Sequence, residues 1–132
     1  MKRVLVIISV LVLLIATLMA GCSGNKSTPT FADSTQVINL NVNQEFIIAL
    51  QANPTTGYDW QPVFDAGFIG QDSKTYKQDD SSGQPMVGSG GTDFFTFKAL
   101  KIGETKIAFT YYRPWETPKP EDKQQVFNII IK

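Results

Sequence analysis

The chain has 132 residues, with 12 basic and 12 acidic side chains and no histidine. A formal net charge of 0 argues against nucleic-acid binding, which relies on clustered Lys and Arg to neutralise phosphates. Without histidine, catalysis by Cys-His or Ser-His-Asp groups is excluded, so we expect neither enzyme activity nor a cofactor. A metal site is also disfavoured, although Ca²⁺ binding among Asp72, Asp79 and Asp80 stays open.

Residues 1–21 have the pattern of an export signal. Lys2 and Arg3 precede a nearly continuous apolar run, residues 4–20, which leads through small residues to Cys22, the chain's one cysteine. This arrangement resembles a bacterial lipobox, so we expect cleavage before Cys22 and a lipid on that residue. The protein would then be exported and membrane-anchored, on the cell surface or the periplasmic side. An uncleaved anchor is the alternative, because the run approaches the ~18 residues that a span needs.

Residues 22–35 separate the expected anchor from the rest of the chain. They are rich in Ser, Thr, Gly, Asn and Pro, and Phe31 is their one large apolar residue, which is typical of a flexible tether. Removal of the signal leaves 10 basic and 12 acidic residues, a net charge of −2. The remaining residues 36–132 suffice for one core without a disulfide, and we expect a single, monomeric domain.

Alternating apolar and polar residues predict β-strands throughout residues 36–132. We expect strands at 37–42, 45–51, 58–61, 75–78, 92–100, 104–112 and 124–131. In one of them, Phe95 and Phe97 are expected on the core face and Asp93 on the opposite face. Short strands of period two at regular spacing are typical of an antiparallel sandwich, and Trp60 suits the buried tryptophan of Ig-like folds. The sequence therefore predicts an all-β, Ig-like antiparallel β-sandwich without a disulfide.

The first of three unusual loops reads Asn53-Pro54-Thr55-Thr56-Gly57 and continues into Tyr58. Pro54 fixes φ and restricts Asn53 to extended geometry, whereas Gly57 gives access to conformations that other residues adopt only at a cost. The tip between them is therefore short, polar and stiff. A stiff tip loses little conformational entropy on docking, although a plain strand connection is the commoner meaning of such turn residues.

The second loop, Gly88-Ser89-Gly90-Gly91, has almost no side chains. Its bare backbone would permit close approach of another protein and offer it N–H and C=O groups. A β-rich segment follows, whereas a phosphate-binding loop precedes a helix, so we exclude nucleotide binding. A flexible tip is the alternative.

The third loop begins with Arg113-Pro114-Trp115 and is rich in proline. Exposed Trp and Arg are favoured anchors of protein interfaces, and Arg113 is the one arginine beyond the signal. The alternative has Trp115 folded back over the end of the sandwich, because Trp is usually well buried. Since alternate loops of an Ig-like sandwich lie at the same end, we expect all three loops to form one wedge suited to a cleft.

The three motifs in this order resemble the chagasin family, protein inhibitors of papain-like cysteine peptidases. The resemblance implies that residues 53–57 enter the peptidase cleft, with Thr55 nearest the catalytic cysteine and Tyr58 directly behind. It implies that residues 88–91 flank the cleft through backbone contacts and that residues 113–115 pack on its other wall. Inhibition would be tight, reversible and steric, with no peptide bond offered for attack.

A second class of function stays open from the residues alone. A lipid-anchored Ig-like adhesion or carbohydrate-binding module could stack sugars on Tyr111, Tyr112 and Trp115. Such a module would have no use for a rigid Asn-Pro-Thr-Thr-Gly tip, and that feature favours the inhibitor.

Overall fold

A computed structural model describes residues 27–79, 88 and 90–132. Within them the chain forms eight strands and one short 3-10 helix: β1 (Thr30–Phe31), β2 (Ile38–Leu40), β3 (Glu45–Ala52), η2 (Pro54–Thr56), β4 (Asp59–Phe64), β5 (Ile69–Gln78), β6 (Gly91–Ala99), β7 (Gly103–Tyr112) and β8 (Lys123–Ile131). None of the helical structure in this part of the chain is long and apolar enough to cross a membrane. The expected signal, residues 1–21, and Cys22 lie outside the described residues.

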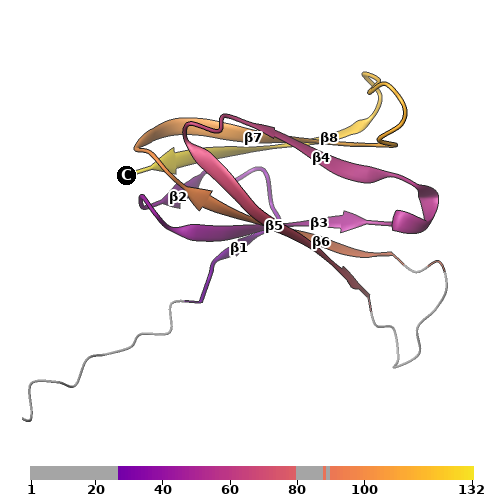
Figure 1. Cartoon of the computed structure of the whole chain (residues 1–132), viewed down its shortest axis with the longest axis horizontal. Coiled ribbons are helices and arrows are strands. Elements are labelled where there is room, and N and C mark those ends of the chain that lie inside the picture. Colours follow the sequence, from indigo (N-terminus) through magenta and orange to yellow (C-terminus); the bar gives the residue numbers. More distant parts are fainter. Residues whose placement is uncertain (1–26, 80–87, 89) are drawn as a thin grey trace, which may run out of the picture.

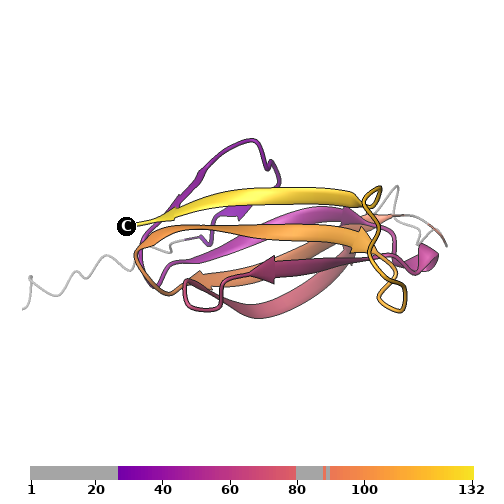
Figure 2. The same cartoon turned by 90° about the horizontal axis from the view of Figure 1, so that it is seen from above.

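The strands form two four-stranded sheets that pack face to face (Figures 1 and 2). One sheet has the order β1-β3-β6-β5 and the other β2-β8-β7-β4. Their pairing is antiparallel except at two edges, where short β1 and β2 run parallel to β3 and β8. The predicted all-β sandwich is confirmed, with one parallel pair added to each sheet.

The core lies between the sheets and is strongly aromatic. Phe109 of β7 is at its centre, with its ring 4.9 Å from Phe95, 5.9 Å from Phe127 and 6.4 Å from Trp60, all in edge-to-face arrangements. Each of these side chains is 1 % exposed or less, and full burial of such a side chain stabilises the fold by about 1.5–3 kcal/mol. Apolar packing thus takes the place of the disulfide, and the prediction of a buried Trp60 is confirmed.

Two strands extend beyond their predicted bounds. β5 begins at Ile69 rather than near residue 75, and β4 continues through Pro62 to Phe64. Both strands lie at the edges of their sheets, where a proline is tolerated because one side of the backbone has no ladder partner. Residues 71–77 of β5 are all exposed, so no alternation of polarity marks them in the sequence.

The sandwich begins earlier in the chain than the sequence predicts. Thr30 and Phe31 pair with β3, the Ile47 N–H donates to the Pro29 carbonyl at 2.8 Å, and the Phe31 ring lies 6.5 Å from that of Phe46. The boundary expected at residue 36 therefore falls inside the domain. A two-residue strand with one apolar side chain is too short to show a period.

Asp93 is the clearest error in the predicted strand faces. Alternate residues of β6 from Gly91 to Ala99 are buried, and Asp93 belongs to this set with 3 % of its surface exposed. The expectation that it faces away from Phe95 was wrong, because its polarity was taken as a sign of exposure.

Candidate functional site

Three loops meet at the end of the sandwich opposite the C-terminus (Figures 1 and 2). The first loop, 53–57, contains η2, and the third, 113–122, joins β7 to β8. The second, 88–91, leads into β6, which begins at Gly91, and is described except for Ser89. Asn53 and Gly90 line one hollow, and Asn53 also lines a second hollow with Glu121 and Asp122 of the third loop, so all three loops contribute to the same surface. We call this surface the loop edge.

The first loop is locked by its own hydrogen bonds. The Asn53 side-chain Oδ1 accepts from the Thr55 N–H at 3.3 Å and from the Thr55 hydroxyl at 2.6 Å, and the Thr56 hydroxyl donates to the Asn53 carbonyl at 2.7 Å. Asn53 is extended and Gly57 is left-handed with φ 78°, as the sequence predicts. Pro54, Thr55 and Thr56 are exposed, so the tip is both stiff and accessible.

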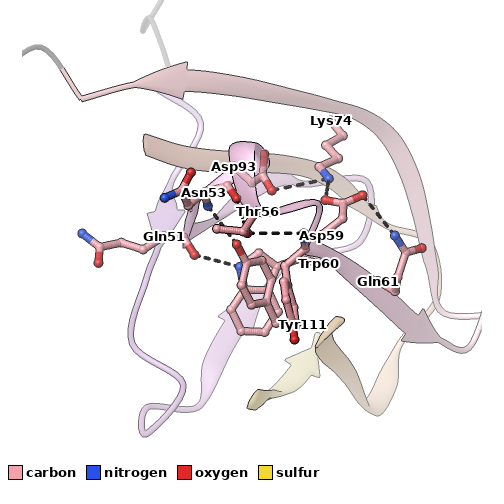
Figure 3. A network of polar contacts seen from close by, with 10 residues as sticks. Gln51, Asn53, Thr56, Asp59, Trp60, Gln61, Lys74, Asp93 and Tyr111 are labelled. Carbon is pink, nitrogen blue, oxygen red and sulfur yellow. Dashed lines mark hydrogen bonds and ion pairs between the residues drawn. The ribbon is translucent and has the colours of Figure 1, made fainter. Parts of the chain in front are cut away.

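An aromatic cluster supports the base of this loop (Figure 3). The Asn53 N–H donates to the Tyr111 hydroxyl at 2.8 Å, and the Tyr111 ring lies 5.5 Å from Tyr58 and 4.8 Å from Trp60. The Trp60 Nε1–H in turn donates to the Gln51 carbonyl at 2.9 Å. Sequence reasoning considered Tyr111 only as a sugar platform and missed this role, which depends on a contact 58 residues apart in the chain.

Trp115 of the third loop lies against the first loop while keeping most of its surface free. The side chain is 72 % exposed, and a Cβ built on Gly57 would lie 2.6 Å from Trp115 Cη2. The alternative in which Trp115 is buried over the end of the sandwich does not fit this exposure. The indole of Trp115 contacts the tip and therefore enlarges the loop edge on one side, next to the exposed Pro114.

Arg113 ties the same two loops together. Its Nε donates to the Thr56 carbonyl at 3.3 Å, its guanidinium carbon lies 4.9 Å from the Tyr58 ring centre, and its Nη1 is 3.4 Å from Glu116 Oε1. Stacking of a guanidinium on an aromatic face is favourable. The half-exposed Arg113 thus braces the tip from the third loop, a role that its sequence position alone does not indicate.

The second loop is exposed at Gly88 and buried at Gly91. Gly88 is exposed with φ 90°, and the Gly90 carbonyl accepts from the Asp79 N–H at 3.1 Å. Gly91 is buried in β6, and a Cβ there would lie 2.4 Å from the Lys77 carbonyl and 2.5 Å from the Tyr76 hydroxyl. The expectation of bare, accessible backbone is therefore wrong at Gly91, where close packing leaves no room for a side chain.

A group of charged residues lies behind the first loop (Figure 3). Lys74 of β5 forms ion pairs with Asp59 at the start of β4 and with Asp93 of β6, the latter at 3.4 Å. Burial raises the pKa of the Asp93 carboxyl above its ordinary value, and the Lys74 charge opposes this shift. Sequence reasoning did not find this group. In the part of the chain that is described, no set of His, Cys, Asp and Glu is arranged to hold a metal ion.

A profile of the family described as Chagasin family peptidase inhibitor I42 matches residues 39–131. The chain belongs to the chagasin family. Amoebiasin-2 of Entamoeba histolytica is 29% identical over 99 residues, which cover 72% of this chain and 76% of the relative. Chagasin of Trypanosoma cruzi is 27% identical over 110 residues, which cover 78% and 94%. The resemblance read from the three motifs is therefore confirmed.

The fold agrees with solved structures of this family. The crystal structure of the cysteine protease inhibitor EhICP2 from Entamoeba histolytica matches with a TM-score of 0.63 and 27% sequence identity, covering 83% of this chain and 91% of that one. Chagasin-family membership makes the chain a peptidase inhibitor and not an enzyme, as the missing histidine predicts.

Proposed function

We propose that this chagasin-family domain inhibits papain-like cysteine peptidases tightly and reversibly by inserting its loop edge into the active-site cleft. The observation that carries the proposal is the exposed tip, Pro54–Thr56, which internal hydrogen bonds hold in a 3-10 turn beside the exposed Trp115. A preorganised tip with an aromatic anchor next to it is the arrangement expected of a tight binder.

The turn also accounts for inhibition without cleavage. Attack on a peptide requires the nucleophile to approach a carbonyl carbon at about 3–3.5 Å with aligned orbitals. The Asn53 and Pro54 carbonyls instead accept from the N–H groups of Thr56 and Gly57 at 3.2 Å and 3.0 Å. Aligning either peptide for attack would break the turn, so Thr55 occupies the position near the catalytic cysteine without presenting a substrate.

The three loops contribute differently to this wedge. The tip fills the cleft, and Arg113 and Trp115 form one flank, where Arg113 also holds the Thr56 carbonyl. Gly88 and Gly90 supply the backbone of the other flank, while Gly91 serves the packing beneath it. The alternative of a sugar-binding module is weakened, because the Tyr111 ring packs on Tyr58 and Trp60 instead of offering a face for a sugar to stack on.

A non-covalent wedge can be tested on a peptidase that cannot react. We expect the domain to bind papain in which the catalytic cysteine is replaced by alanine about as tightly as it binds the active enzyme, by calorimetry. Binding that is lost in this variant would indicate that a covalent bond with the cysteine is needed, and would contradict the proposal.

We further propose that the domain is a lipoprotein attached to a membrane through Cys22. The sandwich begins at Pro29, so residues 23–28 would separate it from the lipid by at most about 20 Å. Residues 27–29 line a hollow with residues 41–45, which form the turn after β2 and the first residue of β3. The turn 41–45 lies at the other end of β3 from the first loop, so a lipid attached there leaves the loop edge free.

The anchor is tested with the full chain and Cys22→Ser. We expect the unmodified chain to be processed and to enter the detergent phase, and Cys22→Ser to lose both the lipid and the cleavage that depends on it. A chain whose mass and partitioning are the same with and without the cysteine would instead support the uncleaved apolar anchor.

A further inference from the structure

The charged group behind the first loop joins strands that follow two different loops. Asp59 begins β4, two residues after Gly57, and Asp93 lies two residues into β6, which follows the second loop. Lys74 comes from the edge strand β5 and contacts both carboxylates. Because β4 and β6 belong to different sheets, this contact crosses the sandwich next to the loop edge.

We propose that Lys74 is a positioning residue for inhibition: its ammonium clamps Asp59 to Asp93 and so fixes the first loop relative to the second. The proposal rests on the proposed function of the loop edge. It assigns a role to residues that lie outside the three sequence motifs.

The topology explains why the start of β4 needs this clamp. β4 is an edge strand whose sheet partner is β7, with Asp59 opposite Tyr112. On its other side a hollow lined by Pro54, Gly57 and Tyr58 continues to Lys74 and Asp93. The Lys74 contacts therefore bridge an open side of the loop base that backbone pairing leaves unsupported.

The charges explain why the clamp has to be a cation. The Asp93 side chain is only 5 % exposed, whereas those of Asp59 and Lys74 are 37 % and 31 % exposed. A buried carboxylate is costly unless a partner compensates it, and Asp59 adds a second negative charge that acts on Asp93. Without Lys74 the two carboxylates would repel, and the more exposed Asp59 would move away together with the loop base.

The surroundings of Asp93 contain few other groups that could replace Lys74. Tyr76 of β5 lies opposite Asp93 in the sheet, and on the β3 side its register partner is Leu50. Burial raises the pKa of Tyr76, and Asp79 and Tyr111, which lie farther along the chain, raise it further. Lys74 is therefore the one cation among the described groups that face this carboxylate, and its ammonium is additionally 5.1 Å from the Phe95 ring centre.

The test uses the substitution Lys74→Met, which removes the charge and keeps the length of the side chain. It is made in the chain from Ser23 onward, because that chain retains the whole sandwich. Two properties are measured: NMR hydrogen exchange of the Thr56 and Gly57 amides, which close the turn, and the inhibition constant for papain. We expect exchange to accelerate, and the inhibition constant to rise, each by roughly tenfold or more. Lys74→Arg should restore most of both losses, because it restores the charge.

Lys77→Met is the matched control. Lys77 is exposed on the same strand but pairs with Thr92 rather than with a core-facing residue, so neither property should change. Acidification should recover part of the inhibition lost in Lys74→Met, because a protonated Asp93 no longer repels Asp59. A general loss of stability would instead accelerate the exchange of amides in the core strands as much as that of the Thr56 and Gly57 amides.

If Lys74→Met does not fold, Lys74→Met combined with Asp93→Asn removes the buried charge as well and takes its place. Because the neutral side chain at position 93 does not repel Asp59 but the clamp is still missing, we expect losses in the same direction that are smaller than those of Lys74→Met. Unchanged exchange in a folded variant that lacks Lys74 would overturn the proposal. Failure of the unmodified chain to inhibit papain would refute the proposed function instead, and the exchange measurement would still decide whether Lys74 positions the loop.

Discussion

The Nε of Arg113 donates a hydrogen bond to the Thr56 carbonyl at 3.3 Å and thereby ties the third loop to the tip of the first. The same guanidinium stacks on Tyr58, whose ring contacts Tyr111. The residues that are expected to meet a peptidase are therefore also the residues that hold one another in place. Substitutions at the loop edge should change preorganisation as well as direct contacts.

Arg113→Lys keeps the charge but removes the planar guanidinium that both bonds the tip and stacks on Tyr58. We expect inhibition to weaken by about 1–2 kcal/mol, since a lysine does not reproduce a stacked, directed contact. Inhibition constants for papain and thermal unfolding provide the measurement. Glu116→Gln, which removes only the half-exposed ion pair with Arg113, is the control and should cost little; an equal effect of both would contradict the bracing role.

Trp115→Ala should weaken inhibition by ~2 kcal/mol or more, the usual cost of losing an aromatic hot spot. Folding stability should change little, because the side chain is 72 % exposed. Val63 is equally exposed, at 71 %, on β4, and Val63→Ala should leave inhibition unchanged. A folded Trp115→Ala that inhibits as well as the unmodified domain would remove Trp115 from the interface.

Gly57→Ala introduces a Cβ at φ 78° and 2.6 Å from Trp115 Cη2. We expect the domain to lose ~1 kcal/mol or more of stability, and inhibition to fall further because the indole has to move. Denaturant unfolding and inhibition constants separate the two effects. Gly70→Ala is the comparison, because its added Cβ would meet Leu100 at an ordinary 3.6 Å, and a loss as large there would argue against a special constraint at Gly57.

Asp93 should make the domain more stable as the pH falls from neutral. Its pKa in the folded state is raised above the ordinary 3.8, so the folded state holds the proton more strongly than the unfolded chain does. The resulting stabilisation is full below the unfolded pKa and is lost as the pH rises through the folded pKa. Asp93→Asn should therefore flatten the dependence of the melting temperature on pH above the ordinary value of 3.8.

The pKa of Asp33 is shifted in the opposite direction from that of Asp93, so Asp33 does not interfere with this test. Hydrogen bonds from the Thr35 hydroxyl and N–H lower its pKa below 3.8, so its contribution is lost only as the pH falls through that lower value. The two carboxylates thus act in separate pH ranges. A profile above pH 3.8 that Asp93→Asn leaves unaltered would contradict the assignment to Asp93.

The sequence predicts those features whose causes are local. Asn53, Pro54 and Gly57 constrain their own dihedral angles, so the stiff tip was visible from residue types, and the alternating residues of β3 follow from one buried face. Features that depend on distant partners were missed. The burial of Asp93 depends on Lys74 from the neighbouring strand, and the support of Asn53 depends on Tyr111.

Titration of papain with the chain from Ser23 onward, followed with a fluorogenic peptide, tests the central claim most directly. We predict stoichiometric inhibition that is recovered on dilution, with a domain of unchanged mass after prolonged incubation. A folded domain that fails to inhibit papain at micromolar concentration, or that is cleaved within residues 53–57, would contradict the reversible wedge.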